Sequence, residues 1–167
     1  MQVNLCFGCM EPTDSYPCPH CGYTPSQKGA EWALQPGSIL NGKYMVGRIL
    51  GQGGFGITYI GWDIALEKKV AVKEYYPSGQ VGRTPGTNAL SWYTSESAAL
   101  ARQTGLEMFL KEARKMSKVD DVSGIVRVRD LFQENQTAYI VMDYVEGETL
   151  KARLQKTGPM AWDQAKG

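Results

Sequence analysis

Hydrophobic and polar residues alternate in five short runs between residues 44 and 142. This period of two, with glycine and polar clusters between the runs, predicts β-strands. The predicted strands span residues 44–50, 57–60, 69–73, 125–129 and 138–142. The centre of the chain is therefore expected to be rich in β-structure.

Between the third and fourth strands the pattern changes to a helical period. Phe109, Ala113 and Met116 recur at i, i+4 and i+7 in a stretch rich in Glu, Lys and Arg. Glu112 is three residues from Phe109 and four from Met116, which predicts that Glu112, and not Glu107, lies on the buried stripe. Strands with one main helix indicate the α+β class.

The connection between the third strand and this helix, residues 77–105, is long and is loaded with Gly, Ser, Thr and Pro in its first half. Residues 95–102 are expected to form a short helix. Connections of this length are usually functional or mobile. The sequence leaves two interpretations open: a docking surface around Trp92 and Tyr93, or a packed connection.

All 4 cysteines lie near the start of the chain, as two Cys-x2-Cys pairs separated by eight residues: Cys6, Cys9, Cys18 and Cys21. Two tight knuckles at this spacing bring four thiolates onto one tetrahedral ion, which predicts a zinc ribbon whose metal supplies the folding energy. Free thiols, two disulfides or an iron site are the alternatives. His20, inside the second knuckle, is expected to point away from the ion.

Composition divides the 167 residues into two unequal parts. Five of the 8 prolines and all 4 cysteines fall within the first 36 residues. We predict a zinc ribbon at 1–24, a polar linker at 25–36 and a larger domain at 37–167. The length, with 43% hydrophobic residues, excludes both a multidomain machine and a disordered chain.

The net charge of +1 gives no general attraction to nucleic acids or anionic membranes, and residues 1–36 carry one lysine against three acidic residues. No apolar run approaches the length of a membrane span, and the first residues lack the features of a secretory signal. We therefore expect a cytoplasmic protein that binds neither nucleic acid nor membrane. Any phosphate must be held by local groups.

The segment Gly51-Gln-Gly-Gly-Phe-Gly56 fits the pattern G-x-G-x-x-G between the first two strands. A dinucleotide-binding fold would continue into a helix, whereas here a strand follows. Glycines that join two antiparallel strands leave backbone N–H groups free, so the loop can lie over a triphosphate. A flexible hairpin turn is the simpler alternative.

Ala71 and Lys73 lie two residues apart in the third strand and therefore share one face. Ala71 leaves room for a flat base, and Lys73 can reach its phosphates. A carboxylate on a buried stripe needs a partner, so Glu112 is predicted to pair with Lys73. An exposed edge lysine and a glutamate on the helix surface are the alternatives.

Four motifs follow one another in order: Leu-Gly-Gln-Gly-Gly-Phe-Gly at 50–56, Val-Ala-Val-Lys at 70–73, Phe-Leu-Lys-Glu-Ala-Arg at 109–114 and Tyr-Ile-Val-Met-Asp-Tyr-Val-Glu-Gly at 139–147. Together they closely resemble the N-terminal lobe of a bacterial eukaryotic-like Ser/Thr protein kinase, over about residues 37–160. The resemblance implies a twisted five-stranded antiparallel sheet, one main helix and an ATP cleft below the sheet.

The resemblance also implies residue roles. Lys73 would contact the α- and β-phosphates of ATP, and Glu112 would hold it. Met142 matches the gatekeeper, and Thr58 stands where the family usually has valine over the adenine. The residues expected to contact the nucleotide are Leu50, Gly51, Gly53, Gly54, Phe55, Gly56, Thr58, Ala71, Lys73, Met142, Asp143 and Val145, with the last two acting through their backbone.

No H-R-D-x-x-x-x-N, D-F-G or A-P-E motif occurs in the sequence, so the family's catalytic base and Mg²⁺ ligands are missing. We therefore expect the ATP-binding lobe of a longer kinase that phosphorylates protein Ser/Thr with ATP and Mg²⁺. This chain alone is expected to be inactive. The alternatives are a non-catalytic, zinc-stabilised regulatory or protein-interaction module and a nucleic-acid-binding zinc ribbon, which the acidic segment disfavours.

Overall fold

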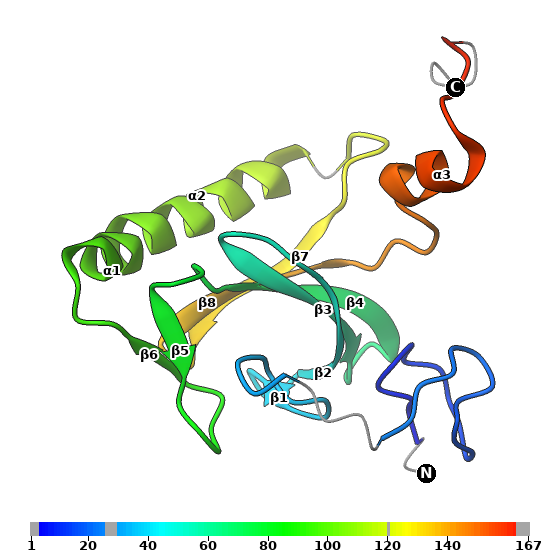
Figure 1. The fold of residues 1–167 in the computed structure, drawn as a ribbon, viewed down its shortest axis with the longest axis horizontal. Coiled ribbons are helices and arrows are strands. Elements are labelled where there is room, and N and C mark those ends of the chain that lie inside the picture. Colours follow the sequence, from blue (N-terminus) through cyan, green and yellow to red (C-terminus); the bar gives the residue numbers. More distant parts are fainter. Residues whose placement is uncertain (1–3, 26–29, 120, 163–167) are drawn as a thin grey trace.

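A computed structural model describes residues 4–25, 30–119 and 121–162. Its centre is a six-stranded antiparallel sheet with the strand order β1-β2-β3-β4-β8-β7 (Figure 1). The strands are β1 (Ile39–Leu40), β2 (Tyr44–Gln52), β3 (Gly56–Asp63), β4 (Lys68–Tyr75), β7 (Val128–Glu134) and β8 (Thr137–Asp143). The predicted α+β class with an antiparallel sheet is confirmed, and the two-residue strand β1 extends the predicted sheet by one strand.

Four of the five predicted strands lie within β2, β3, β4 and β8, whereas the fourth prediction is displaced. The strand predicted at 125–129 begins at Val128 and continues to Glu134, and Ile125 is exposed. Pairing with β8 fixes these bounds, because Phe132 lies opposite Tyr139 and their rings stack at a centroid distance of 5.3 Å. Ile125 and Val126 thus lead into the strand rather than form it.

One long helix lies along a face of the sheet (Figure 1). It consists of α1 (Glu96–Leu100), the π-helical segment η1 (Ala101–Gly105) and α2 (Leu106–Met116). The Ser95 hydroxyl caps its start by accepting a hydrogen bond from the Ala98 N–H at 3.1 Å. Phe109, Leu110 and Ala113 of α2 are buried in one cluster with Ile140 of β8. The predicted main helix is confirmed.

Two shorter helices with described bounds follow: the 3₁₀ helix η2 (Ser117–Val119) and α3 (Leu150–Thr157). Helix α3 stands away from the sheet, on the right of the view in Figure 1, whereas α1 lies on the left. Among the described residues, no helix is both long enough and apolar enough to cross a bilayer.

The opposite face of the sheet is also covered. Val70 and Val72 of β4 are buried there in one cluster with Ala33 and Leu34. A hairpin formed by β5 (Val81–Arg83) and β6 (Leu90–Trp92) adds Val81 and Leu90 to the same cluster. Residues 33 and 34 of the predicted linker therefore belong to the core, while residues 26–29 lie outside the described residues.

The 77–105 connection is thus a packed element. The Trp92 ring lies 6.1 Å from the Tyr75 ring, and its indole N–H donates to the Gln136 carbonyl at 3.0 Å. Tyr93 is 53% exposed. Of the two interpretations left open by the sequence, the packed connection describes the hairpin and Trp92.

Candidate functional site

The four cysteines converge on one point. Their sulfur atoms all lie within 4.8 Å of one another. The Cys6 and Cys21 sulfurs are 3.6 Å apart, and those of Cys9 and Cys18 are 3.9 Å apart. Four thiolates placed about 2.3 Å from a central ion at tetrahedral angles would have sulfurs about 3.8 Å apart. The spacing therefore fits one tetrahedral ion and excludes disulfides, whose sulfurs lie about 2.05 Å apart.

Backbone N–H groups support the knuckles. The Gly8 N–H donates to the Cys6 sulfur at 3.3 Å, and the Gly22 N–H donates to the Cys18 carbonyl at 2.8 Å. Burial acts to raise the pKa of Cys18, but hydrogen bonds from the backbone of His20 and Cys21 overcome it and lower the pKa to about 6. A thiolate at neutral pH is the form that binds a metal. Burial raises the pKa of Cys6 and raises that of Cys9 to about 12, so the assignment of the cluster as a ligand set rests on the spacing of the sulfurs.

This cysteine-bearing segment is docked on the sheet. The Arg48 N–H donates to the Phe7 carbonyl at 2.7 Å, and the Met10 side chain is fully buried. A Cβ at Gly47 would overlap the Phe7 backbone carbonyl oxygen and would lie 2.5 Å from Met10 Cε, so only glycine admits this approach. Lys69 of β4 bridges the Glu11 carboxylate of the segment to Glu146 beyond β8.

Four of the residues expected to contact a nucleotide share one face of the sheet, the face that α2 covers. Thr58 lies opposite Lys73 in the β3–β4 pairing, and Ala71 lies opposite Met142 in the β4–β8 pairing. Directly opposed residues of antiparallel strands point to the same side. The structure therefore brings these four side chains together from three strands.

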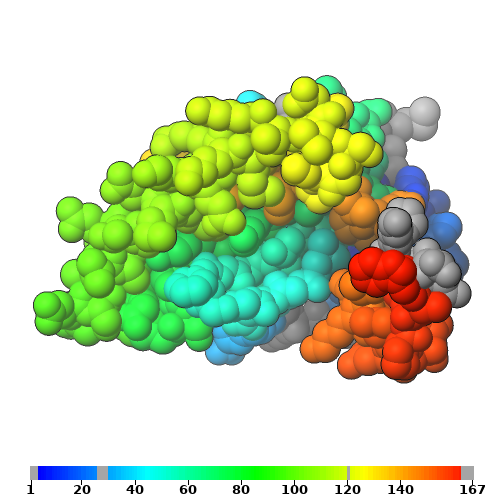
Figure 2. Space-filling model, turned by 90° about the horizontal axis from the view of Figure 1, so that it is seen from above, coloured from blue at the N-terminus to red at the C-terminus, as the bar shows by residue number. Residues whose placement is uncertain are grey.

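The glycine loop connects β2 to β3 at the edge of this face. Figure 2 shows the cyan to turquoise part of the chain, which includes the loop, between α2 and the orange-red C-terminal segment. A Cβ added at Gly51, Gly53 or Gly54 would meet no atom within 4 Å, and none of the three has a positive φ. At Gly56, in contrast, a Cβ would lie 2.6 Å from the Glu74 carbonyl oxygen. The fold requires only the last of these four glycines.

Three other residues expected to contact the nucleotide have side chains that are exposed to solvent. Leu50 is 40% exposed, Phe55 76% and Val145 67%. The backbone of Val145 has no hydrogen-bond partner among the described residues. Asp143 differs, because its carboxylate accepts two hydrogen bonds from Arg129 at 2.6 and 3.0 Å, and these lower its pKa.

Lys73 and Glu112 are not paired in the described part of the chain. The Lys73 ammonium lies 5.8 Å from the centroid of the Phe109 ring, and the Glu112 side chain is exposed. The prediction that Glu112 lies on the buried stripe is therefore wrong for this structure. The stripe includes Leu110 as well as Phe109 and Ala113, and this shifts its centre away from Glu112.

A buried polar cluster on the other face of β4 escaped the sequence analysis. The Glu74 carboxylate is fully buried and accepts hydrogen bonds from the Tyr59 and Tyr139 hydroxyls at 2.8 and 3.2 Å. Arg83 of the hairpin donates to both Glu74 oxygens. Burial and the Glu74 charge raise the pKa of both tyrosines, which stay protonated as donors. The sequence could have indicated this buried carboxylate, because the alternation of β4 places Glu74 on the face of Val70 and Val72.

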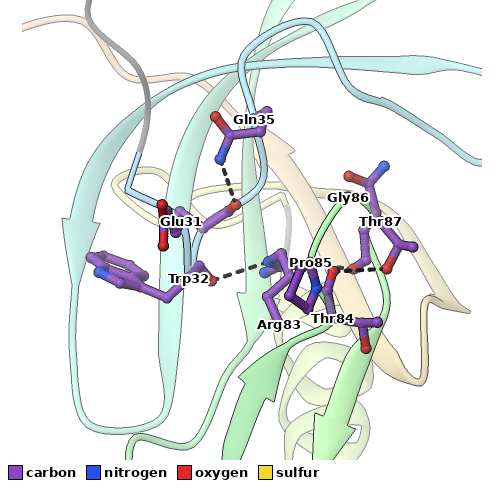
Figure 3. A pocket seen from close by; sticks show the side chains of 10 residues that line it. Glu31, Trp32, Gln35, Arg83, Thr84, Pro85, Gly86 and Thr87 are labelled. Atoms are coloured by element: carbon purple, nitrogen blue, oxygen red, sulfur yellow. Dashed lines mark hydrogen bonds between the residues drawn. The ribbon is translucent and has the colours of Figure 1, made fainter.

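A hollow of about 730 Å³ lies beside this cluster, between residues 31–35 and the hairpin loop at 83–88 (Figure 3). The Arg83 guanidinium at its wall donates to the carbonyls of Trp32 and Asn88 as well as to Glu74. Each of its three nitrogens therefore donates to the protein. We assign this hollow to the packing of the hairpin, on the opposite side of the sheet from Lys73.

The chain matches the protein kinase domain family over residues 44–167. Serine/threonine-protein kinase PrkC of Bacillus subtilis is 32% identical over 124 residues, which cover 74% of this chain and 16% of the relative. Serine/threonine-protein kinase pkn2 of Myxococcus xanthus is 34% identical over 129 residues, covering 76% and 13%. The chain thus spans less than one fifth of the length of these relatives.

Solved structures of kinases also resemble this chain. The apo form of PpkA-294 has a TM-score of 0.67 and 31% sequence identity, over 76% of this chain and 43% of that one. The kinase domain of Mycobacterium tuberculosis PknI, at 19% identity and a TM-score of 0.54, shows the same fold over 80% of this chain and 45% of its own. The chain therefore belongs to the protein kinase family, as a part of the domain that resembles those of bacterial Ser/Thr kinases.

Proposed function

We propose that this chain is the ATP-binding lobe of a bacterial Ser/Thr protein kinase. The observation that carries the proposal is the glycine loop, in which Gly51, Gly53 and Gly54 have neither a crowded Cβ position nor a positive φ. Glycines that the fold does not need are explained by a ligand that must approach the backbone closely. The phosphates of ATP are such a ligand.

The remaining parts of the site have matching roles. Lys73 supplies a cation for the α- and β-phosphates, and Ala71 and Met142 border the space for the base. The exposed backbone of Val145, with that of Asp143, would hold the adenine edge. Thr58 adds a hydroxyl to the roof of this space. Glu112 is proposed as the partner of Lys73 in the active arrangement, with the helix moved from its present position.

In the full-length kinase, the proposed reaction transfers the γ-phosphoryl group of ATP to a Ser or Thr hydroxyl of a protein. Mg²⁺ would accompany ATP and neutralise charge that develops on the phosphates. The family's catalytic-loop and metal-binding motifs are absent from these 167 residues. We therefore propose that phosphoryl transfer needs the other part of the kinase domain.

We propose zinc as the ion held by Cys6, Cys9, Cys18 and Cys21. Four thiolates at tetrahedral spacing are typical of structural zinc sites, which stabilise segments too small to form a core. The docking of this segment through Phe7 and Met10 supports a structural role on the kinase lobe. The reduced thiols are consistent with the proposed cytoplasmic location.

Titration with Mg-ATP, followed by NMR, tests the proposed function. The expected result is weak, saturable binding with a dissociation constant well above the micromolar range, because only one wall of the cleft is present. Lys73→Met should weaken binding about tenfold, since it removes a charge-assisted phosphate contact. Lys68→Met, five residues earlier in the same strand, is the matched control and should bind like the native chain.

Two results would contradict this proposal. Absence of any saturable binding would favour the non-catalytic interaction module. Equal weakening by Lys68→Met and Lys73→Met would show that binding reflects general charge and not the proposed site.

A further inference from the structure

Tyr75 reaches from the sheet into the main helix. It lies two residues after Lys73 in β4, so both side chains point toward the helix-covered face. Its hydroxyl donates to the Ala101 carbonyl at 2.8 Å, and the side chain is only 3% exposed. Ala101 begins the π-helical segment η1, where the Leu106 N–H also donates to its carbonyl. The hydroxyl is thus seated in a widened helical turn.

Gly105, at the end of η1, makes room for this hydroxyl. A Cβ at position 105 would overlap the Tyr75 hydroxyl oxygen and would lie 3.2 Å from its Cζ. The φ of Gly105 is −67°, an ordinary helical value that any residue adopts. Glycine weakens a helix relative to alanine, so its presence here is explained by space and not by backbone conformation.

The widened turn sets the rotation of α2. A π turn adds one residue, which rotates the following residues by about 100° relative to an uninterrupted α-helix. In the resulting orientation, the Phe109 ring lies 5.3 Å from the Tyr75 ring and 5.8 Å from the Lys73 ammonium. Glu112 is exposed, and Lys73 forms no ion pair among the described residues.

We propose that Tyr75 is a positioning residue of the nucleotide site. Its hydroxyl, hydrogen-bonded to the Ala101 carbonyl, holds α2 in its present rotation about the helix axis. In this rotation the Phe109 ring lies next to Lys73, and Glu112 is kept away from the lysine. Release of this contact lets the helix turn and Glu112 approach the lysine. The inference rests on the proposed function, in which Lys73 binds the phosphates. Tyr75 itself touches no nucleotide.

The ε-CH₂ resonances of Lys73 report the helix position without any nucleotide. In the native chain the Phe109 ring current should displace them, and Lys73→Arg identifies them by their loss. Tyr75→Phe removes only the hydroxyl, so this displacement should decrease. Mg-ATP affinity should rise about fivefold, the factor by which one hydrogen bond shifts a two-state equilibrium. A tyrosine with a merely structural role would lower the affinity or leave it unchanged.

Gly105→Ala is a second, independent variant. Its Cβ displaces the Tyr75 hydroxyl while favouring a regular helix, so it should change the Lys73 resonances in the same direction. The matched control is Tyr76→Phe. Tyr76 is equally buried but belongs to the cluster on the opposite face, and its hydroxyl has no hydrogen bond among the described residues. Tyr76→Phe should change neither the resonances nor the affinity.

Glu112→Gln, added to Tyr75→Phe, should cancel the gain in affinity and leave the resonance change in place. Native Lys73 resonances in both Tyr75→Phe and Gly105→Ala would overturn the inference, as would an equal change in Tyr76→Phe. If the native chain bound no Mg-ATP, the proposed function would fail. The resonances would still show separately whether Tyr75 sets the helix position.

Discussion

The Glu74 carboxylate and the Arg83 guanidinium form a buried ion pair, with Arg83 Nη2 at 2.8 and 2.7 Å from the two carboxylate oxygens. Neither side chain is more than 3% exposed. Glu74 immediately follows Lys73, so successive residues of β4 serve opposite faces of the sheet. Glu74 holds the hairpin on one face, while Lys73 is available to the cleft on the other.

Arg83→Met should lower the free energy of unfolding by about 3–5 kcal/mol, because it leaves the Glu74 carboxylate buried without its charged partner. Urea unfolding measures this loss. Lys156→Met, which breaks the exposed pair with Glu148, is the control and should cost less than about 1 kcal/mol. Similar losses of unfolding free energy in the two variants would show that the buried pair stabilises the fold no more than the exposed pair does.

Protein purified without added metal should contain one zinc ion per chain by elemental analysis, since four thiolates lie at tetrahedral spacing. Cys18→Ser should lose the metal and unfold the segment around it. His20→Ala should keep the metal. Less than about half an equivalent of zinc, with no iron in its place, would contradict the zinc site.

Gly53→Ala should affect nucleotide binding, whereas Gly56→Ala should affect stability. A Cβ at 53 meets open space, so stability should stay within about 0.5 kcal/mol of native while Mg-ATP binding weakens. A Cβ at 56 would crowd the Glu74 carbonyl, so this variant should unfold at a lower temperature. Thermal unfolding and nucleotide titration of both variants test the assignment, which fails if Gly53→Ala binds nucleotide like the native chain.

Gly47→Ala should loosen the cysteine-bearing segment from the sheet, because the new Cβ would overlap the backbone carbonyl oxygen of Phe7 in that segment. Amide hydrogen exchange of residues 5–23 should accelerate. Lys69→Ala removes only partly exposed ion pairs and should change stability by less than about 1 kcal/mol. Native exchange rates in Gly47→Ala would show that close packing at this position does not hold the segment.

Much of the fold could be predicted from local pattern. Alternation placed four strands within their observed bounds, and the Phe109–Ala113 spacing located the main helix. The spacing of the cysteines and of the glycine loop needs no tertiary information. Ala71 and Lys73 could be placed on one face because a strand has a strict period of two.

The features of the fold that could not be predicted from local pattern depend on tertiary contacts. Ala33 and Leu34 lie in a segment with neither helical nor strand periodicity, so their spacing does not indicate that they cover the far face of the sheet. The Arg83–Glu74 pair joins a hairpin to a strand and becomes visible only when the two are packed. The exposure of Glu112 could not be predicted from the spacing of Phe109, Ala113 and Met116, because Leu110 also belongs to the buried stripe and shifts its centre.

The burial of Ala33 and Leu34 shows that the start of the hydrophobic core and the start of the family match are two different boundaries. The match to the protein kinase domain family begins at residue 44, whereas the hydrophobic core already includes Ala33. A chain cut at the homology boundary would leave an apolar trough over Val70 and Val72, a surface through which copies of the chain would aggregate. The hydrophobic core of this protein thus extends beyond the region that the family matches, and Ala33, Leu34 and Leu40 belong to it.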